Sequence, residues 1–550
     1  MRILKKKTFL VLVVALISFG AGVLTTAAAR ADRAETLRNL ERFSRVYQKI
    51  LSSYVEEEDS NELVDAAIQA MIDKLDPFST YMDADMLSDL MVKTHGEFGG
   101  LGIIISVRDD FPTVISPIED TPAARLGIRG GDKIVEIEGE GTKGWDVQDA
   151  VDKLRGPEGT PVTIGIKRFG VDEVLPYTIT RAIIPVVSVP YHFVLADDIG
   201  YIRCTQFGEQ TSTEMRAALD DLQGQGIKGL ILDLRNNPGG LLEAAKDVSD
   251  LFLDAGQIIV STRGRDGRRL QEIYATTDDR YAKNYPLVVM INENSASASE
   301  IVAGAIQDWD RGLVVGQNSF GKGSVQSIFQ ISDDEALKLT TAKYYTPSGR
   351  CIHKDENNHR ITPEEMLQHA QAAEAEDGDD STQLQQAPEI PIDQSDLPLY
   401  STLKLQRPVR GGGGIMPDIV LAPDEISDAA LDLERRSAFF NFAVELLADH
   451  PVTIDFKVDA ALMQRFHDWL KDNGIELEDQ AFTDNEDYIR MALRREVLYK
   501  QFGNVEAYRS TLGMDRVLQE TLNLLKGQRD LDALLARSGE DDSATSKTQQ

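Results

Sequence analysis

Three short segments of the sequence carry residue types that could act together in covalent catalysis. Residues 233–240 (DLRNNPGG) and 294–300 (NSASASE) each follow an apolar run typical of a buried strand, and each opens a helix-like stretch. Backbone N–H groups at such a junction can face a developing negative charge, and a serine there is well placed to act as a nucleophile. Residues 319–326 (SFGKGSVQ) place Lys322 between two glycines. A serine nucleophile with a lysine base is one chemistry that these segments could perform.

Each segment also has a plain structural explanation. The glycines can serve close packing only, and Ser295, Ser297 and Ser299 can be N-caps with Glu300 supporting the first helical turn. Lys322 can be an ordinary surface lysine in a turn. In an apolar pocket, however, burial would lower the pKa of its amine and let it accept a proton. A phosphate-binding loop is excluded because the Gly-x4-Gly-Lys-Ser/Thr pattern is absent.

These segments recur in one order with two others, residues 344–350 (YYTPSGR) and 414–419 (GIMPDI). In this order and spacing the chain resembles the carboxyl-terminal processing peptidases, also called tail-specific proteases, over about residues 40–422. The resemblance implies an α/β (α+β multidomain) fold with a ClpP/crotonase-like core and a Ser/Lys dyad.

The resemblance also assigns roles to individual residues of this chain. Ser297 matches the nucleophile, Lys322 the general base, and Gln326 the residue that orients the lysine. The N–H group of Ala298, together with that of Gly239 or Gly240, matches the oxyanion hole. Glu300 and Asp308 match positions that support the site, although helix capping or packing could also explain these two residues.

A second module is implied between the N-terminal region and the core. Residues 90–185 resemble a PDZ domain, which would bind apolar C-terminal residues of a substrate as an added strand. Its carboxylate-binding loop matches Gly100, Leu101, Gly102 and Ile103. Arg168 is either a latch between this domain and the active site or a surface arginine.

Changes in composition and apolar pattern along the chain predict five regions. The expected boundaries are 1–31 for a signal or anchor, 32–90 for N-terminal helices, 91–185 for the PDZ domain, 186–424 for the protease core and 425–550 for a C-terminal helical region with a disordered end. Within the core, an acidic flexible insertion is predicted over about 355–408. In the N-terminal helices, Leu63, Ala67, Met71 and Leu75 form a stripe that should pack on a neighbour.

The N-terminus has the three-part layout of a secretory signal. Basic residues at positions 2, 5, 6 and 7 precede an uncharged run over 8–29, and residues 29–31 (ARA) offer a cleavage site. The run is also just long enough to span a bilayer, so an uncleaved anchor is the alternative. Both cases place residues from 32 onward outside the cytoplasm, in the periplasm or tethered to the inner membrane facing it.

Composition narrows the function further. With 58 basic and 90 acidic side chains, the formal net charge is −32, which argues against nucleic-acid binding. Cys204 and Cys351 are the two cysteines, so a disulfide-rich scaffold and a multi-cysteine metal site are excluded, although the two could pair. The seven histidines form no HExxH motif. We expect no metal and no cofactor.

The sequence thus predicts an exported serine endopeptidase that recognises envelope proteins by their C-termini and cleaves them through an acyl-enzyme. Two alternatives are a silent PDZ adaptor on the same fold and a Ser-His-Asp protease. The second needs a Gly-x-Ser-Gly-Gly segment, which is absent. An adaptor protein, a membrane tether and a homo-oligomer are possible partners or states that the sequence leaves open.

Overall fold

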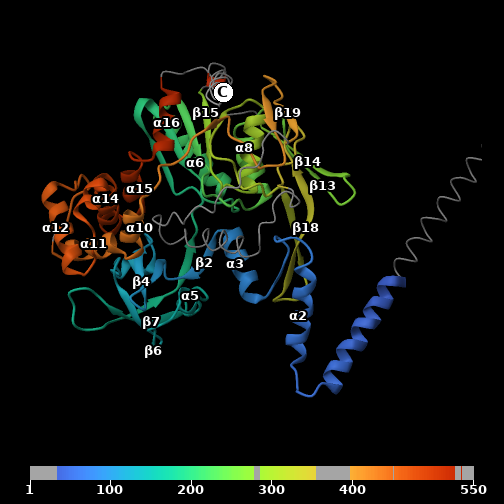
Figure 1. The fold of residues 1–550 in the computed structure, drawn as a ribbon, viewed down its shortest axis with the longest axis horizontal. Helices are drawn as coiled ribbons and strands as arrows, with labels where there is room; N and C mark the ends of the chain where they lie inside the picture. Colours follow the sequence, from blue (N-terminus) through green and yellow to red (C-terminus); the bar gives the residue numbers. More distant parts are fainter. Residues whose placement is uncertain are drawn as a thin grey trace, which may run out of the picture. The chain divides into compact units, whose positions relative to one another are not determined.

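The computed structural model describes residues 34–277, 281, 285–354, 397–449, 451–526 and 534–535. The chain forms two compact units, Met1–Asp76 and Pro77–Gln550 (Figure 1). The predicted signal or anchor, residues 355–396 of the predicted insertion and the polar C-terminal end lie outside the described residues. In the ranges given above, no helix has the length and apolar character that a membrane span requires.

The first unit contains, in its described part, a helix over residues 34–53 and α2 (Ser60–Ile72). The predicted packed stripe is covered in part only: Leu63 and Ala67 are half-buried, whereas Met71 is 61% exposed and Leu75, beyond the helix end, is 53% exposed. A unit of this size has little surface with which to cover an apolar stripe.

The predicted PDZ module lies in the second unit and consists of short strands with two helices. The main sheet has the order β3-β4-β5-β7-β8, with β6 paired to β5, and β2 pairs with β9. The elements are β2 (Glu97–Gly100), β3 (Ile103–Arg108), β4 (Phe111–Pro117), α4 (Pro122–Arg125), β5 (Lys133–Ile137), β6 (Glu140–Gly141), α5 (Val147–Leu154), β7 (Pro161–Lys167), β8 (Leu175–Thr180) and β9 (Ala182–Pro185). Ile134 and Ile137 of β5 and alternate residues of β7 are buried in one apolar core with α5.

A six-stranded sheet forms the centre of the protease core. Its order is β10-β11-β12-β15-β16-β21, and every pair is parallel except β10 with β11. The strands are β10 (Tyr191–Val194), β11 (Ile199–Arg203), β12 (Gly229–Asp233), β15 (Leu287–Ile291), β16 (Leu313–Gly316) and β21 (Ile419–Val420), and a short 3-10 helix, η1 (Ala196–Asp198), precedes β11. β12 and β15 are buried throughout, which confirms the prediction that these apolar runs are covered on both faces.

Helices supply that cover from both sides (Figure 1). One face packs on α6 (Thr211–Gly224), α7 (Leu242–Asp250) and α8 (Ala298–Asp308). The other face packs on α15 (Asn504–Thr511) and α16 (Arg516–Leu525), which come from the C-terminal region.

A second sheet flanks the core. Its path is β1-β18-β13-β14, and β17 also pairs with β18. The elements are β1 (Thr80–Met82), β13 (Ile258–Arg263), β14 (Arg269–Tyr274), β17 (Ser324–Gln330) and β18 (Ala336–Tyr345), while α3 (Ala84–His95) leads from β1 to the PDZ module.

The end of the predicted flexible insertion is ordered, which corrects the boundary at 408. β19 (Leu399–Ser401) pairs with β20 (Pro408–Arg410) in a hairpin. Arg407, in the connecting turn, forms ion pairs with Asp310 (2.8 Å) and Asp418 (2.6 Å), both nearly fully buried. Composition misjudged this part because partners distant in sequence hold it.

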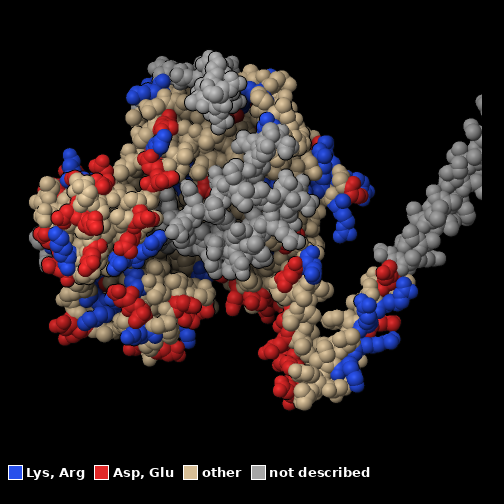
Figure 2. All heavy atoms as spheres, viewed as in Figure 1, with Lys and Arg blue, Asp and Glu red and all other residues tan. Residues whose placement is uncertain are grey.

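The remaining C-terminal helices form a separate apolar core, as predicted for a bundle. They are α10 (Asp428–Arg435), α11 (Ala438–Asp449), α12 (Ala460–Asp472), α13 (Asp479–Asp484) and α14 (Glu486–Phe502). This bundle contacts the PDZ module, where the Arg108 guanidinium lies 4.3 Å from the centre of the Phe440 ring. On the face shown in Figure 2, acidic and basic side chains are interspersed over both parts.

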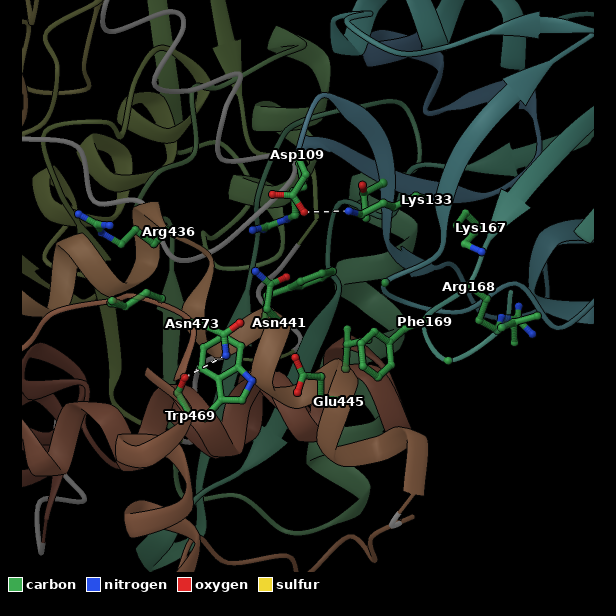
Figure 3. A pocket seen from close by; sticks show the side chains of 18 of the residues that line it. Asp109, Lys133, Lys167, Arg168, Phe169, Arg436, Asn441, Glu445, Trp469 and Asn473 are labelled. Atoms are coloured by element: carbon green, nitrogen blue, oxygen red, sulfur yellow. Dashed lines mark hydrogen bonds and ion pairs between the residues drawn. The ribbon is translucent and has the colours of Figure 1, made fainter. Parts of the chain in front are cut away.

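A pocket of about 750 Å³ lies where the bundle meets the PDZ module (Figure 3). Lys133 and Asp109 on its PDZ side form an ion pair at 2.8 Å, while Trp469 and Asn473 line it from α12 and the turn that follows. None of its lining residues belongs to the three segments that could perform catalysis.

Candidate active site

Ser297 occupies the junction between a buried strand and a helix. A short loop separates it from β15, and α8 begins at the next residue. Its φ of +54° and ψ of −108° fall in a region that non-glycine residues rarely adopt, at a cost of about 1–3 kcal/mol. An ordinary N-cap serine has extended backbone instead. The strained turn therefore favours a nucleophile presented at the helix N-terminus over a simple cap.

The two neighbouring serines hold loops together. The Ser295 hydroxyl donates to the Leu234 carbonyl at 2.8 Å, and the Ser299 hydroxyl donates to the Asn237 carbonyl at 2.8 Å. Both serines are fully buried. Among the described residues, the Ser297 hydroxyl makes no hydrogen bond to the loop over 233–240. The Ser297 side chain faces the Glu300 N–H in a capping box at the start of α8, so of the three serines only the middle one is not used to hold the loop over 233–240.

The glycine pair of the first segment approaches Ser297 closely. Asn237, which is fully buried, accepts the Ala296 N–H at 3.0 Å and so ties the two loops together. A Cβ at Gly239 would lie 2.8 Å from the Ser297 Cβ and 2.9 Å from the Ala298 nitrogen. No side chain fits in that space, so the glycine is required by contact as well as by its φ of +100°.

Backbone donors for an oxyanion are available beside Ser297. The Gly239 N–H donates to the Asn237 side-chain oxygen at 2.9 Å. Within the described ranges, neither the Gly240 N–H nor the Ala298 N–H donates to an acceptor. Gly240 is held by a bridge to Phe207. Of the two glycines predicted as alternatives, Gly240 therefore has the open N–H group.

Glu300 joins the serine segment to the lysine segment. Its side chain is fully buried. Oε2 accepts the backbone N–H groups of Ser297 (2.8 Å) and Lys322 (2.9 Å), and Oε1 accepts the Ser319 hydroxyl (2.5 Å) and the Gly321 N–H (2.8 Å). Burial raises the pKa of the Glu300 carboxyl, while the hydrogen bonds from Ser319, Ser297 and Gly321 oppose that shift.

Because one oxygen of Glu300 accepts from both N–H groups, the backbone nitrogens of Ser297 and Lys322 lie less than about 6 Å apart. The two segments are thus brought together by a residue that the sequence placed only in a supporting role.

Lys322 lies in a tight turn and is partly removed from solvent. Gly321 has φ +90°, and a Cβ at Gly323 would lie 2.5 Å from the His353 nitrogen. The Lys322 Nζ lies 5.1 Å from the centre of the Phe78 ring. An aromatic neighbour and partial burial fit a lysine with a defined place better than a solvated surface lysine.

Gln326 lies two residues into β17, close to Lys322 in sequence. Its amide nitrogen donates to the hydroxyls of Ser324 (2.8 Å) and Thr340 (3.2 Å). These bonds fix the amide group, and the orienting contact with Lys322 stays a prediction.

Asp308 lies at the far end of α8 from Ser297. It forms an ion pair with Arg350 at 2.8 Å, and neither side chain is exposed. Its Oδ2 also accepts the Ser348 N–H at 2.9 Å. Asp308 therefore anchors the YYTPSGR segment to α8 and does not reach the nucleophile's end of the helix.

The predicted carboxylate-binding loop links β2 to β3. The carbonyls of Leu101 and Gly102 accept the N–H groups of Ala123 (3.0 Å) and Ile118 (2.9 Å). In the described part of the chain, the Leu101 and Gly102 N–H groups make no hydrogen bond. β3 is the edge strand of its sheet, and α5 lies beside it. This edge can accept a further strand.

Arg168, the predicted latch or surface arginine, is bound within its own domain. It forms two hydrogen bonds of 2.7 Å to the Asp132 carboxylate, which is buried. The side-chain hydrogen bond with Asp132 raises the pKa of the Arg168 guanidinium.

Cys204 and Cys351 form no disulfide with each other. No cluster of three or more metal-ligating side chains occurs among the residues that the structure describes.

Sequence reasoning missed the residues that tie the loops together: Asn237, Asn292 and Ser319. Asn292 accepts the Asn236 N–H at 2.7 Å, and the Ser319 hydroxyl accepts the Ile415 N–H at 2.6 Å. All lie inside or beside the recognised motifs. Their positions within the motifs are visible in the sequence, but the residues that they bind lie far away along the chain.

Comparisons with known proteins match three parts of the chain to family models. Residues 198–366 match the model of peptidase family S41, residues 113–168 that of the PDZ domain, and residues 21–86 that of the activating protease CtpB N-terminal domain. The chain is 45% identical over 334 residues to the carboxy-terminal-processing protease of Bartonella bacilliformis. This alignment covers 60% of this chain and 76% of the relative.

It is also 38% identical over 315 residues to the carboxy-terminal processing protease CtpA of Bacillus subtilis, covering 57% of this chain and 66% of that protein. Among solved structures, it is similar to a photosystem II D1 C-terminal processing protease (28% identity, 56% of this chain, 89% of that chain, TM-score 0.33).

These matches confirm the predicted family, the α/β protease fold and the PDZ domain, and nothing in them favours a silent adaptor. The chain belongs to the carboxy-terminal processing proteases, serine-type peptidases of family S41 that carry a PDZ domain.

Proposed function

We propose that this peptidase works through a Ser297–Lys322 dyad. Ser297 Oγ attacks the carbonyl carbon of the scissile peptide bond while Lys322 accepts the hydroxyl proton. The N–H groups of Ala298 and Gly240 stabilise the oxyanion. The C–N bond then breaks, Lys322 returns its proton to the leaving amine, and water hydrolyses the acyl-enzyme.

One observation carries this assignment. The Glu300 carboxylate accepts N–H groups from both Ser297 and Lys322, at 2.8 and 2.9 Å. A buried carboxylate is costly unless its oxygens are satisfied, so the two segments are held in one arrangement. The positive φ of Ser297 and the separate use of Ser295 and Ser299 support the choice of serine.

Fluorophosphonate labelling tests the nucleophile. We expect covalent labelling of the wild-type chain, located to Ser297 by peptide mass spectrometry, and none in Ser297→Ala. Ser299→Ala is the matched control: it removes a neighbouring hydroxyl that holds the loop at Asn237, so we expect it to be labelled at Ser297, but more slowly than the wild type. Labelling at Ser299, or undiminished labelling of Ser297→Ala, would contradict the assignment.

Substrate termini are proposed to bind at the loop over 100–103. There the open N–H groups of Leu101 and Gly102 would hold a terminal carboxylate, while the chain adds to the edge of β3. We expect a peptide with a free C-terminus to be cleaved at least about tenfold more efficiently than its C-terminal amide, since the amide lacks the charge. Equal kcat/KM values for the two peptides would count against this loop.

The N-terminal segment supports a location in the cell envelope, with a cleaved signal or a retained anchor. Envelope proteins recognised by their C-termini would then be the substrates. Fractionation of producing cells, with N-terminal sequencing of the protein, decides between the two forms. Recovery of the full-length chain in the cytoplasm would exclude both.

A homo-oligomer is supported by the helix over 34–53. Apolar side chains there are exposed, among them Leu37 (56%), Leu40 (60%) and Phe43 (51%), and uncovered apolar surface of this kind often marks an interface. Sedimentation of the full chain over a range of concentrations tests this, and a monomer throughout would refute it. A pull-down with the inactive Ser297→Ala chain as bait tests whether an adaptor protein also binds.

A further inference from the structure

The segment that carries the oxyanion glycines begins at a buried charge cluster. Asp233, the last residue of β12, is fully buried and accepts a hydrogen bond from the Tyr201 hydroxyl at 2.7 Å. Arg235 donates to the same carboxylate at 2.6 Å, and Arg203 lies 3.2 Å away. Burial opposes ionisation, but the Arg235 and Arg203 guanidiniums hold the pKa of Asp233 well below its usual range.

The C-terminal helices reach this cluster at two points. Asp515 accepts two hydrogen bonds from Arg235, at 3.1 and 2.6 Å, in a bidentate pair. Tyr508 shares a 2.6 Å hydrogen bond with the Tyr201 hydroxyl, which itself bonds Asp233. Both contacts therefore converge on the carboxylate from which the oxyanion loop starts.

Apolar packing fixes the position of these helices. Leu512, Val517 and Leu518 are buried against the face of the sheet opposite α8, together with Ile231 and Met290. Asp515 also caps α16 through the Leu518 N–H at 3.0 Å. The carboxylate is thus held both by the helix that it starts and by the arginine of the core.

Charge balance makes Asp515 more than a cap. Two arginines, Arg203 and Arg235, face two carboxylates, Asp233 and Asp515, and all four side chains are largely buried, with exposures of 11%, 15%, 0% and 23%. Without the Asp515 charge, one guanidinium would have no counter-charge in a region of low dielectric, which favours a local rearrangement.

A rearrangement at Arg235 would displace the loop that lies beside the nucleophile. The next residue, Asn236, donates its N–H to Asn292 at 2.7 Å, and Asn237 bonds the Ala296 N–H and the Ser299 hydroxyl. These bonds lie between the charge cluster and the glycine pair, so the loop has little freedom to absorb a shift.

We propose that Asp515 is a positioning residue for the oxyanion loop, so that the C-terminal helices are part of the apparatus that aligns the catalytic site. The proposal rests on the proposed function, because it assigns Gly240 and Ala298 to the oxyanion. Asp515 holds the guanidinium of Arg235, and Arg235 holds the carboxylate of Asp233. These two contacts together set the position at which the loop leaves β12. Its effect is therefore on transition-state stabilisation and not on peptide binding.

The test variant is Asp515→Asn in the full chain. Asparagine is as good an N-cap as aspartate, so α16 keeps its start while the negative charge that faces Arg235 is lost. We expect kcat for a peptide substrate to fall by about 10²-fold, the size typical of a small misplacement of catalytic groups, with KM unchanged. Asp515→Glu should recover part of the loss.

Asp459→Asn is the matched control. Asp459 caps α12 through the Leu462 N–H at 2.8 Å, as Asp515 caps α16, and among the described residues it makes no hydrogen bond or ion pair with the charge cluster. Its variant should keep the wild-type kcat. If Asp515→Asn does not fold, Tyr508→Phe decides: it removes only the hydroxyl next to Tyr201, and a fall in kcat at constant KM supports the same conclusion.

Two outcomes would overturn the proposal. One is a kcat for Asp515→Asn, or for Tyr508→Phe where the first does not fold, within twofold of wild type. The other is an equal fall in Asp459→Asn, which would show only loss of helix stability. Failure of the proposed function is distinguishable, since the wild-type chain would then not be labelled at Ser297.

Discussion

Lys322→Arg is expected to abolish peptide cleavage although it keeps the positive charge. The guanidinium does not lose its proton in proteins, so it cannot accept one from Ser297. A fall in kcat of about 10⁴-fold is expected, the upper range for a general base, whereas Ser297→Ala removes the nucleophile and should cost about 10⁶-fold. Steady-state hydrolysis of a peptide by the purified chain measures both.

Lys338→Arg is the control for the lysine variant. Lys338 lies on β18, and burial together with the nearby Lys93 lowers the pKa of its amine. It is therefore another lysine that could be considered as a base. We expect its variant to retain activity. Loss of turnover in Lys338→Arg with retention in Lys322→Arg would move the base to the other lysine.

Glu300→Gln is expected to reduce both stability and activity. Each carboxylate oxygen of Glu300 accepts two hydrogen bonds, but a glutamine has one acceptor oxygen and an NH2 group that would meet two donors. At least two buried donors then lose their partner, at about 1–3 kcal/mol each. Because two of the four donors belong to Ser297 and Lys322, we expect kcat to fall by about 10²-fold or more. Thermal unfolding and peptide hydrolysis report the two effects.

Glu214→Gln separates these effects. Glu214 accepts the backbone N–H groups of Ser188 and Val189 on one oxygen, both at 2.8 Å, and burial raises the pKa of its carboxyl. Its variant should lower stability slightly and leave kcat unchanged. If Glu300→Gln lost stability and kept full kcat, Glu300 would be a structural carboxylate only.

Much of the architecture could be predicted from local sequence. The apolar runs at 230–234 and 287–291 are buried parallel strands, because a strand covered on both faces has no polar side to alternate with. The short strands and helices of the PDZ module follow the alternation and turn residues of their own segments. Local rules failed at the end of the α2 stripe, where Met71 is exposed, and for the hairpin β19–β20, where ion pairs order a segment of low apolar content.

By itself, the sequence determined the class of chemistry and the fold that carries it, because these depend on which residues are present and in what order: a serine, a lysine and a glycine pair at their junctions. The tertiary structure alone decided how each one is used. It used the hydroxyls of Ser295 and Ser299, but not that of Ser297, to hold the loop over 233–240. It also placed Glu300 between the serine and lysine segments and paired Asp308 with Arg350. It also brought Asp515 to Arg235, 280 positions away. A hydrogen bond or ion pair depends on distance in space, and the packing of apolar faces on the central sheet sets that distance.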